Sequence, residues 1–293
     1  MYLYKKERVA KFWFSLPTIV FFSIMIIFPI LFTLVISTTN WTLSASLPDF
    51  VGMRNYLSLL HDTRFLNSLG RTLYFTITAS VCETVLGIAF AVLLNRSFPG
   101  RNVVKTLFLL PFAATPVAVS MTWMLIFDPN LGVANTALAA LGIPAQTWLA
   151  SPDTALGCLI FVEIWQGTAI VTLLISAGLS TVPEDYYEAA RIDGASSWQM
   201  FWRLTLPLLS GTILIAFIMR FVEVIKAFDI IYSTTNGGPM YATETLNIYG
   251  YLMAFQYFQF GSASALIVLF TVVVTLIGVC LLKVKKWTGE GLE

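Results

Sequence analysis

The chain has 293 residues, of which 57% are hydrophobic and only 11% charged, and its mean hydropathy is +0.80. A soluble protein of this length could not hide so much apolar surface, because soluble domains carry about a quarter charged residues. The net charge of +1 is uninformative about nucleic acid, but no basic stretch is long enough to follow nucleic-acid phosphates. The composition therefore predicts a protein that lies in a lipid bilayer.

Six segments are long and apolar enough to cross a bilayer as helices, which takes about 20 residues each. They are residues 12–37, 71–94, 104–127, 155–178, 206–232 and 261–283. Because each run is continuously apolar rather than alternating, a β-barrel is disfavoured. No long hydrophilic insertion separates the runs. We therefore expect residues 1–293 to form a single all-α transmembrane domain with six transmembrane helices.

The segment from Trp41 to Gly70, between the first two spans, mixes apolar and polar residues. Its apolar positions, among them Tyr56, Leu57 and Leu60, indicate an external loop with a short amphipathic helix near the membrane interface. An ordinary loop that covers the bundle remains an equal alternative.

The basic residues between the spans indicate the orientation of the chain. Twelve of them fall at the two termini and in the connections after the second and fourth spans: Lys5, Lys6, Arg8, Lys11, Arg96, Arg101, Lys105, Arg191, Arg203, Lys283, Lys285 and Lys286. The opposite side carries only Arg54 and Arg64, with Arg71 at a boundary. Because cytoplasmic loops are enriched in lysine and arginine, both termini are predicted to be cytoplasmic.

The connection between the fourth and fifth spans, residues 183–205, has the pattern of a short helical hairpin. Pro183 suits the first turn of a helix, where a missing N–H costs nothing, and Glu184 favours the positive helix end. Gly194 permits a turn, and Pro207 marks the start of the fifth span. The hairpin suits docking into a groove of a partner. From periodicity alone, packing on the chain's own bundle is an equal alternative.

The same loop resembles the EAA motif of binding-protein-dependent ABC importer permeases. Its spacing is reproduced by Glu188-Ala189-Ala190, then Gly194, then Leu204-x-Leu206-Pro207, with Leu204 in place of the usual isoleucine. The resemblance implies a type I ABC importer transmembrane domain, in which this coupling loop sits in a cleft of an ATP-hydrolysing subunit. The residues that it assigns to ATPase coupling are Glu188, Ala189, Ala190, Asp193, Gly194 and Pro207.

A second resemblance narrows the family to sugar permeases. The segments 227–232, 234–239 and 242–246 are similar to the end of the fifth span in permeases of the maltose, lactose and glycerol-phosphate type. Together the similarities cover residues 29–285 and fit the first of two non-identical permease subunits. They imply import of a carbohydrate or polyol across the inner membrane of a bacterial cell.

The resemblance also implies partners: a second permease subunit, a dimer of ABC ATPase subunits, an extracytoplasmic solute-binding protein and membrane lipid. Because the sequence contains no G-x-x-x-x-G-K-[ST] loop, the chain is expected to bind no cofactor and not to be an enzyme. ATP and Mg would be used by the ATPase. With one histidine and three scattered cysteines, no metal site is expected.

The external segment Asn236-Gly237-Gly238-Pro239 has the composition of a tight turn, with glycines free to take positive φ. Its predicted location makes it a candidate contact for the binding protein. A purely structural turn is the favoured single explanation.

Ionisable residues inside spans are costly and usually face a cavity or one another. They are Glu83 in the second span, Glu163 in the fourth, and Arg220, Glu223, Lys226 and Asp229 in the fifth. On one continuous helix Arg220 and Asp229 would lie on opposite faces, so the four residues of the fifth span could not all line one pore. Arg220 and Glu223 are expected to form a sugar-facing patch, with pairing between helices as an equal alternative. For Lys226 and Asp229, pairing is favoured.

The resemblance to maltose-type permeases supports a substrate pathway over Gln166, Gly167, Arg220 and Glu223. The side chains differ from those of the family, which implies a different cargo. Three alternatives stay open. They are an ABC importer permease for a polyamine, phosphate or amino acid, an ion-coupled secondary transporter that uses Glu83 or Glu163 as a relay, and a membrane scaffold or enzyme subunit.

Overall fold

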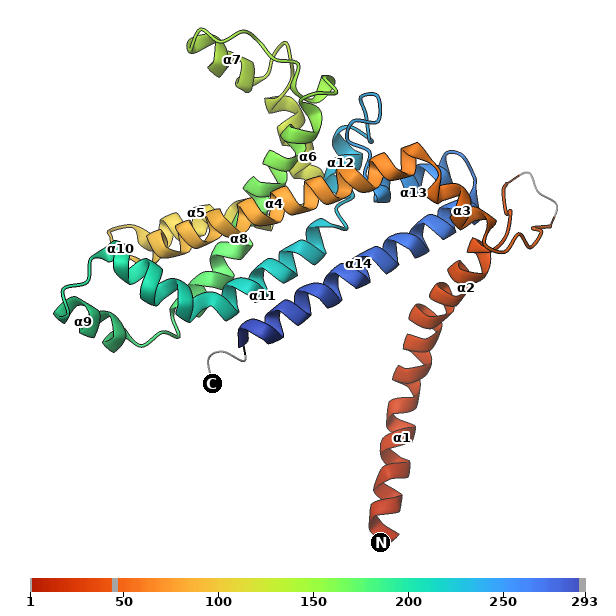
Figure 1. Ribbon diagram of the computed structural model, residues 1–293, viewed down its shortest axis with the longest axis horizontal. Coiled ribbons are helices and arrows are strands. Elements are labelled where there is room, and N and C mark those ends of the chain that lie inside the picture. The colour runs from red at the N-terminus through yellow and green to blue at the C-terminus, as the bar shows by residue number, and fades with distance from the viewer. Residues whose placement is uncertain (1, 44–46, 290–293) are drawn as a thin grey trace. The chain divides into compact units, whose positions relative to one another are not determined.

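The computed structural model describes residues 2–43 and 47–289, and within these ranges it contains helices and loops but no β-strand (Figure 1). An isolated bridge joins Thr39 to Phe50. Residues 1, 44–46 and 290–293, which belong to the predicted 1–293 domain, lie outside the described residues. The predicted all-α class is confirmed.

The helices of the first half are α1 (Tyr2–Phe22), α2 (Phe28–Ser37), α3 (Arg54–Leu60), α4 (Thr63–Asn95), α5 (Arg101–Ala113), α6 (Pro116–Ile126) and α7 (Val133–Ala140). Those of the second half are α8 (Ala155–Leu179), α9 (Glu184–Ile192), α10 (Ser197–Met200), α11 (Leu206–Val224), α12 (Asp229–Thr234), α13 (Leu246–Phe255) and α14 (Phe260–Gly289). Two π-helical turns, Ser23–Ile27 and Phe201–Thr205, join α1 to α2 and α10 to α11.

Among the described residues, five helical segments are long and apolar enough to span a membrane. They are Phe12–Ser37, Thr63–Asn95, Ala155–Leu179, Ser197–Val224 and Phe260–Lys283. They correspond to the first, second, fourth, fifth and sixth predicted spans, although the second and fifth begin earlier than expected. A sixth span is obtained when α5 and α6 are counted together.

The predicted third span, residues 104–127, is broken rather than straight. Between α5 and α6 the backbone is extended at Ala114 and Thr115, and the two helices are bent by 98°. Thr115 precedes Pro116, and the proline ring disfavours a helical conformation at the residue before it. The proline thus ends one helix and begins the next.

The fifth span also ends earlier than predicted. α11 ends at Val224, and α12 begins at Asp229 after an irregular segment in which Phe228 has φ −133°. The expectation of one helix over 206–232 is therefore wrong. No glycine or proline lies in this segment, so the sequence gives no local signal for the break.

The chain divides into two compact units. The first comprises residues 1–65 and 250–272. In it, the Asn55 side chain donates to the carbonyls of Ser37 and Thr39, and the Tyr56 hydroxyl lies 2.6 Å from the Ser37 hydroxyl. These contacts hold α3, whose Tyr56 side is buried while Leu57 is exposed. The expected short amphipathic helix in the 41–70 segment is present.

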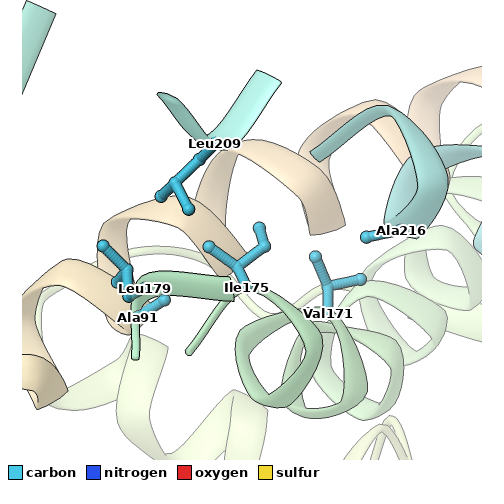
Figure 2. Close-up of a cluster of buried hydrophobic side chains, with 6 residues drawn as sticks. All are labelled: Ala91, Val171, Ile175, Leu179, Leu209 and Ala216. Carbon is cyan, nitrogen blue, oxygen red and sulfur yellow. The ribbon is translucent and has the colours of Figure 1, made fainter. Parts of the chain in front are cut away.

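The second unit comprises residues 66–249 and 273–293 and contains a tightly packed core between α4, α8 and α11 (Figure 2). Its buried side chains are Ala91, Val171, Ile175, Leu179, Leu209 and Ala216. Lipid tails are as apolar as leucine, so helices in a bilayer associate through close packing, which small residues permit. Gly87 shows this, because a Cβ atom there would lie 2.5 Å from a methyl carbon of Val171.

Candidate functional site

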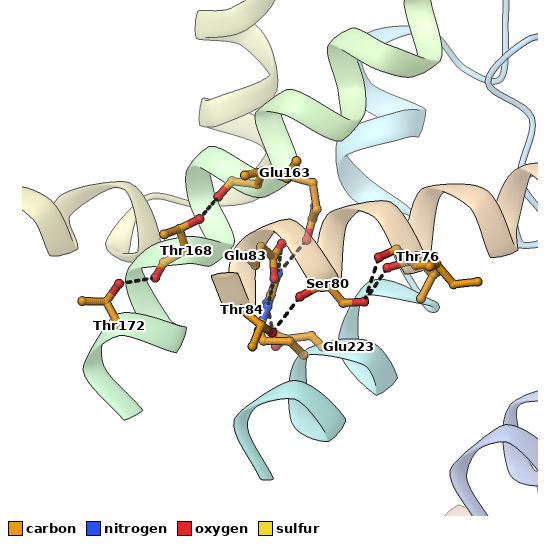
Figure 3. Close-up of polar contacts among 11 residues, drawn as sticks. Thr76, Ser80, Glu83, Thr84, Glu163, Thr168, Thr172 and Glu223 are labelled. Carbon is orange, nitrogen blue, oxygen red and sulfur yellow. Dashed lines mark hydrogen bonds and ion pairs between the residues drawn. The ribbon is translucent and has the colours of Figure 1, made fainter. Parts of the chain in front are cut away.

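Three carboxylates from three helices of the second unit meet at one arginine (Figure 3). Arg220 on α11 binds Glu83 on α4 through two bonds, Nε to Oε2 at 2.6 Å and Nη2 to Oε1 at 3.0 Å. Its Nη2 also donates to Glu163 Oε1 on α8 at 2.9 Å, and its Nη1 donates to Glu223 Oε2 at 2.8 Å. The two-bond pairing with Glu83 fixes the plane of the guanidinium.

The cluster is buried on one side and exposed on the other. The Glu83 side chain is fully buried and that of Arg220 is 5% exposed, whereas Glu163 is 14% and Glu223 is 63% exposed. Buried charges of this kind are tolerated only when they are paired and hydrogen-bonded. Gly167 on α8 makes the packing feasible, because a Cβ atom there would overlap Arg220 Nη2 and Glu83 Oε1.

The exposed side of the cluster faces a cavity of about 380 Å³. Its lining comes from α5, α6, α8, α11, α12 and the broken segments between them: Phe112, Ala114, Pro116, Glu163, Gln166, Gly167, Arg220, Glu223, Lys226, Ala227, Phe228, Asp229 and Ile230. All four predicted pathway residues are among them, so the structure brings them together. The Gln166 side-chain amide also donates to the carbonyl of Ala114 at 3.2 Å, just after the end of α5.

Lys226 and Asp229 line the same cavity as Arg220 and Glu223. The expectation that these four residues could not share one surface is therefore wrong. It assumed a continuous helix, whereas α11 ends at Val224 and the chain changes direction before Asp229. The favoured pairing of Lys226 and Asp229 between helices is also not seen, because neither residue forms an ion pair in the described part of the chain.

Sequence reasoning missed that Glu83 and Glu163 belong to the Arg220 cluster. Both are recognisable as ionisable residues inside spans, and that was the available signal. It also missed a stripe of buried hydroxyls on α4, in which Thr72, Thr76, Ser80 and Thr84 each donate to the carbonyl four residues earlier at 2.6–2.7 Å. These hydroxyls are satisfied within their own helix.

The coupling loop forms the expected helical hairpin. α9 begins directly after Pro183, and Gly194 ends the turn with φ +77°, a conformation that favours glycine. Ser196 caps α10 by accepting from the Gln199 N–H, and the Gln199 side chain accepts from the Ser196 N–H. The hairpin is tied to the start of the fifth span by the Tyr187 hydroxyl, which lies 3.2 Å from that of Thr205.

The residues assigned to coupling are mostly solvent-exposed on this hairpin. Glu188, Ala189, Asp193 and Gly194 are exposed and Ala190 is half-buried, while Pro207 lies apart from them in the first turn of α11. Ile192 beside them is 86% exposed. Docking of a partner on this hairpin stays a prediction.

The Asn236–Pro239 segment is a tight turn, as predicted. Asn236 and Gly237 have positive φ values of 49° and 85°, but Gly238 does not. Asn236 is exposed, whereas Gly237 is buried against Ile248. Contact with a binding protein at this turn stays a prediction, and Gly237 could contribute to it only by shaping the backbone.

Residues 83–284 match the family described as the binding-protein-dependent transport system inner membrane component. The chain belongs to this family. The permease is 36% identical over 290 residues to the trehalose/maltose transport system permease protein MalF of Thermococcus litoralis, with 97% of each chain covered. It is 33% identical over 284 residues to the multiple sugar-binding transport system permease protein MsmF of Streptococcus mutans, with 96% and 98% covered.

The fold of the permease is that of an ABC importer transmembrane domain. It matches a chain in the crystal structure of a bacterial ABC transporter involved in the import of the acidic polysaccharide alginate, with a TM-score of 0.85. The match covers 98% of the permease and 99% of that chain at 22% identity. The predicted membrane class and fold are confirmed.

Proposed function

We propose that this permease is one of the two transmembrane subunits of an ATP-driven importer that takes up a carbohydrate or polyol delivered by a solute-binding protein. The observation that carries the proposal is a charged cavity among the spans of a chain that is similar, over nearly its whole length, to two permeases named for sugar transport. Hydroxyl-rich ligands need hydrogen-bonding groups beside an apolar wall, which Glu223 and Phe228 provide.

The proposed assembly contains a second permease subunit, a dimer of ATPase subunits that use ATP and Mg, and an extracytoplasmic binding protein. The chain itself would carry neither a catalytic site nor a cofactor, and as one domain it would lie in the inner membrane with both termini in the cytoplasm. The distribution of basic residues supports this orientation. It places the coupling loop on the side where ATP is available.

In the proposed cycle, ATP binding closes the ATPase dimer and displaces the docked coupling loop as a rigid body. Because α9 and α10 are joined by the Gly194 turn and continue into the fifth span, the displacement is transmitted to α11. The two permease subunits then rock between inward-facing and outward-facing states, and the cargo passes through the cavity at Glu223. Hydrolysis resets the cycle.

A matched pair of glycine variants tests the coupling role. Gly194 and Gly142 have φ values of +77° and +72°, and at both positions nothing lies within 4 Å of the place that a Cβ atom would take. Leucine therefore strains both turns to a similar degree. We expect Gly194→Leu to abolish uptake of radiolabelled trehalose or maltose at an unchanged amount in the membrane, and Gly142→Leu to retain it. Normal uptake by Gly194→Leu would refute the coupling role.

The ion-coupled alternative makes a different prediction. A secondary transporter would accumulate sugar in proteoliposomes that contain this chain without any ATPase, driven by an ion gradient. The proposed importer takes up none under those conditions and requires ATP, the ATPase and the binding protein together. Uptake without the ATPase would therefore replace this proposal with the alternative.

A further inference from the structure

The hydrogen-bonding capacity of Arg220 is almost fully used by the protein itself. A guanidinium has five N–H donors. Four bonds run from Arg220 to carboxylate oxygens, two to Glu83 and one each to Glu163 and Glu223. Arg220 therefore lines the cavity without being available as a two-bond partner for a carboxylate or phosphate on the cargo.

Glu83 is the carboxylate that occupies the back of this guanidinium. It is fully buried, takes both Nε–H and an Nη2–H, and is absent from the cavity wall. Gly167 on α8 faces both side chains and has no side chain of its own. Glu83 on α4 and Arg220 on α11 can therefore contact each other directly. The guanidinium is thus held back from the cavity with its charge neutralised on the buried side.

The groups that the cavity offers to cargo are consequently hydrogen-bond acceptors with a net negative charge. The formal net charge of the cavity wall is −1, from three carboxylates (Glu163, Glu223 and Asp229) and two cations (Arg220 and Lys226). Glu83, which lies behind Arg220, adds a second negative charge. A carboxylate accepts hydrogen bonds from hydroxyl or ammonium groups and repels another anion.

We propose that this cavity admits neutral or amine-bearing carbohydrates and excludes sugar acids and sugar phosphates, with Glu83 as the positioning residue that sets this preference. The inference deepens the proposed function and rests on it for the nature of the cargo. Without the Glu83 carboxylate, two guanidinium N–H groups lose their partner. Arg220 is then free to turn toward the cavity as an anion-binding group.

The charge of the cavity can be measured without knowing the cargo. Ala227 lines the cavity and is half-buried, so a cysteine there reports on it, in a background where Cys82, Cys158 and Cys280 are replaced by alanine. In membrane vesicles that hold the full transporter, the probes are cationic trimethylammonium-ethyl and anionic sulfonatoethyl methanethiosulfonate. Their labelling rates are divided by the rates measured with free cysteine.

We expect the cationic reagent to label Ala227→Cys about tenfold faster than the anionic one, as a net negative charge a few ångströms away requires. Glu83→Gln should reduce this preference by about tenfold, and Arg220→Gln should increase it. A disturbance of packing alone would move both variants in the same direction. The control is Glu244→Gln, which removes an equally buried carboxylate outside the cavity wall and should leave the preference unchanged.

Equal or faster labelling by the anionic reagent in the parent protein overturns the inference, as does a shift of the same sign in Glu83→Gln and Arg220→Gln. If Glu83→Gln does not accumulate in the membrane, Arg220→Gln and the parent protein still decide the sign of the charge. Uptake of radiolabelled trehalose, maltose and alginate oligosaccharide separates the two proposals. Vesicles that take up no sugar but label as expected contradict the proposed function alone. Uptake of the acidic oligosaccharide at the rate of the neutral sugars contradicts the inference alone.

Discussion

The contact at Gly167 permits a quantitative test of the buried charge cluster. A methyl group added by Gly167→Ala would lie 2.5 Å from Glu83 Cδ and overlap the Arg220 guanidinium. Either side chain can escape only by giving up charged hydrogen bonds, and its surroundings are a packed core. Breaking one such bond costs about 1.5–3 kcal/mol, and overpacking costs about 1–3 kcal/mol. Alanine in place of glycine gains back about 0.5–1 kcal/mol in a helix, so we expect Gly167→Ala to lower the free energy of unfolding by about 2–5 kcal/mol.

Gly157 provides the matched control within the same helix. It also lies in α8, but nothing is found within 4 Å of the position that a Cβ atom would take. Replacing glycine by alanine inside a helix stabilises it by roughly 0.5–1 kcal/mol when space is free. Gly157→Ala should therefore be as stable as the parent protein or slightly more stable.

The assay is unfolding of the purified permease in mixed micelles by increasing fractions of SDS, followed by far-ultraviolet circular dichroism. The two variants should shift the midpoint in opposite directions. Rescue adds a second criterion, because shortening the opposing side chain in Gly167→Ala/Glu83→Asp makes room for the methyl group and should recover part of the loss. Equal midpoints for Gly167→Ala and Gly157→Ala would refute the packing argument.

Three further predictions concern regions outside the cavity. Ser196→Ala removes the cap of α10 and should reduce the stability of the hairpin by about 1 kcal/mol, seen as faster amide exchange at Gln199. Asn135→Ala removes four hydrogen bonds, including the one from Trp148, and should make the loop between α6 and α8 sensitive to protease. Asn135→Gln keeps an amide group and should increase this sensitivity less. Two backbone N–H groups hold the pKa of Asp128 below its usual range, so its contribution is present at neutral pH and is lost as acid titrates through that lowered pKa. The protection factor of the Leu131 amide, which compares its exchange with that of an unstructured peptide at the same pH, should fall in acid in the parent protein and be low at all pH values in Asp128→Ala.

Much of the fold follows from local sequence signals. Spans are recognisable because each must supply about 20 apolar residues in a row, whatever its neighbours are. The hairpin of the coupling loop was also predictable from local signals, because Pro183 and Gly194 act on the backbone next to them. The break at Thr115 also has a local signal in Pro116, but membrane helices tolerate prolines inside continuous spans, so the proline alone does not decide between a break and a span.

The charge cluster was decided by tertiary structure alone. Arg220 lies 137 residues from Glu83 and 57 from Glu163 along the chain, and their meeting depends on how α4, α8 and α11 are rotated about their own axes. Helical periodicity fixes which residues share a face of one helix but not which face meets which neighbour. The break between Val224 and Asp229 likewise has no proline or glycine behind it. Only the packed bundle therefore places Lys226 and Asp229 on the cavity wall.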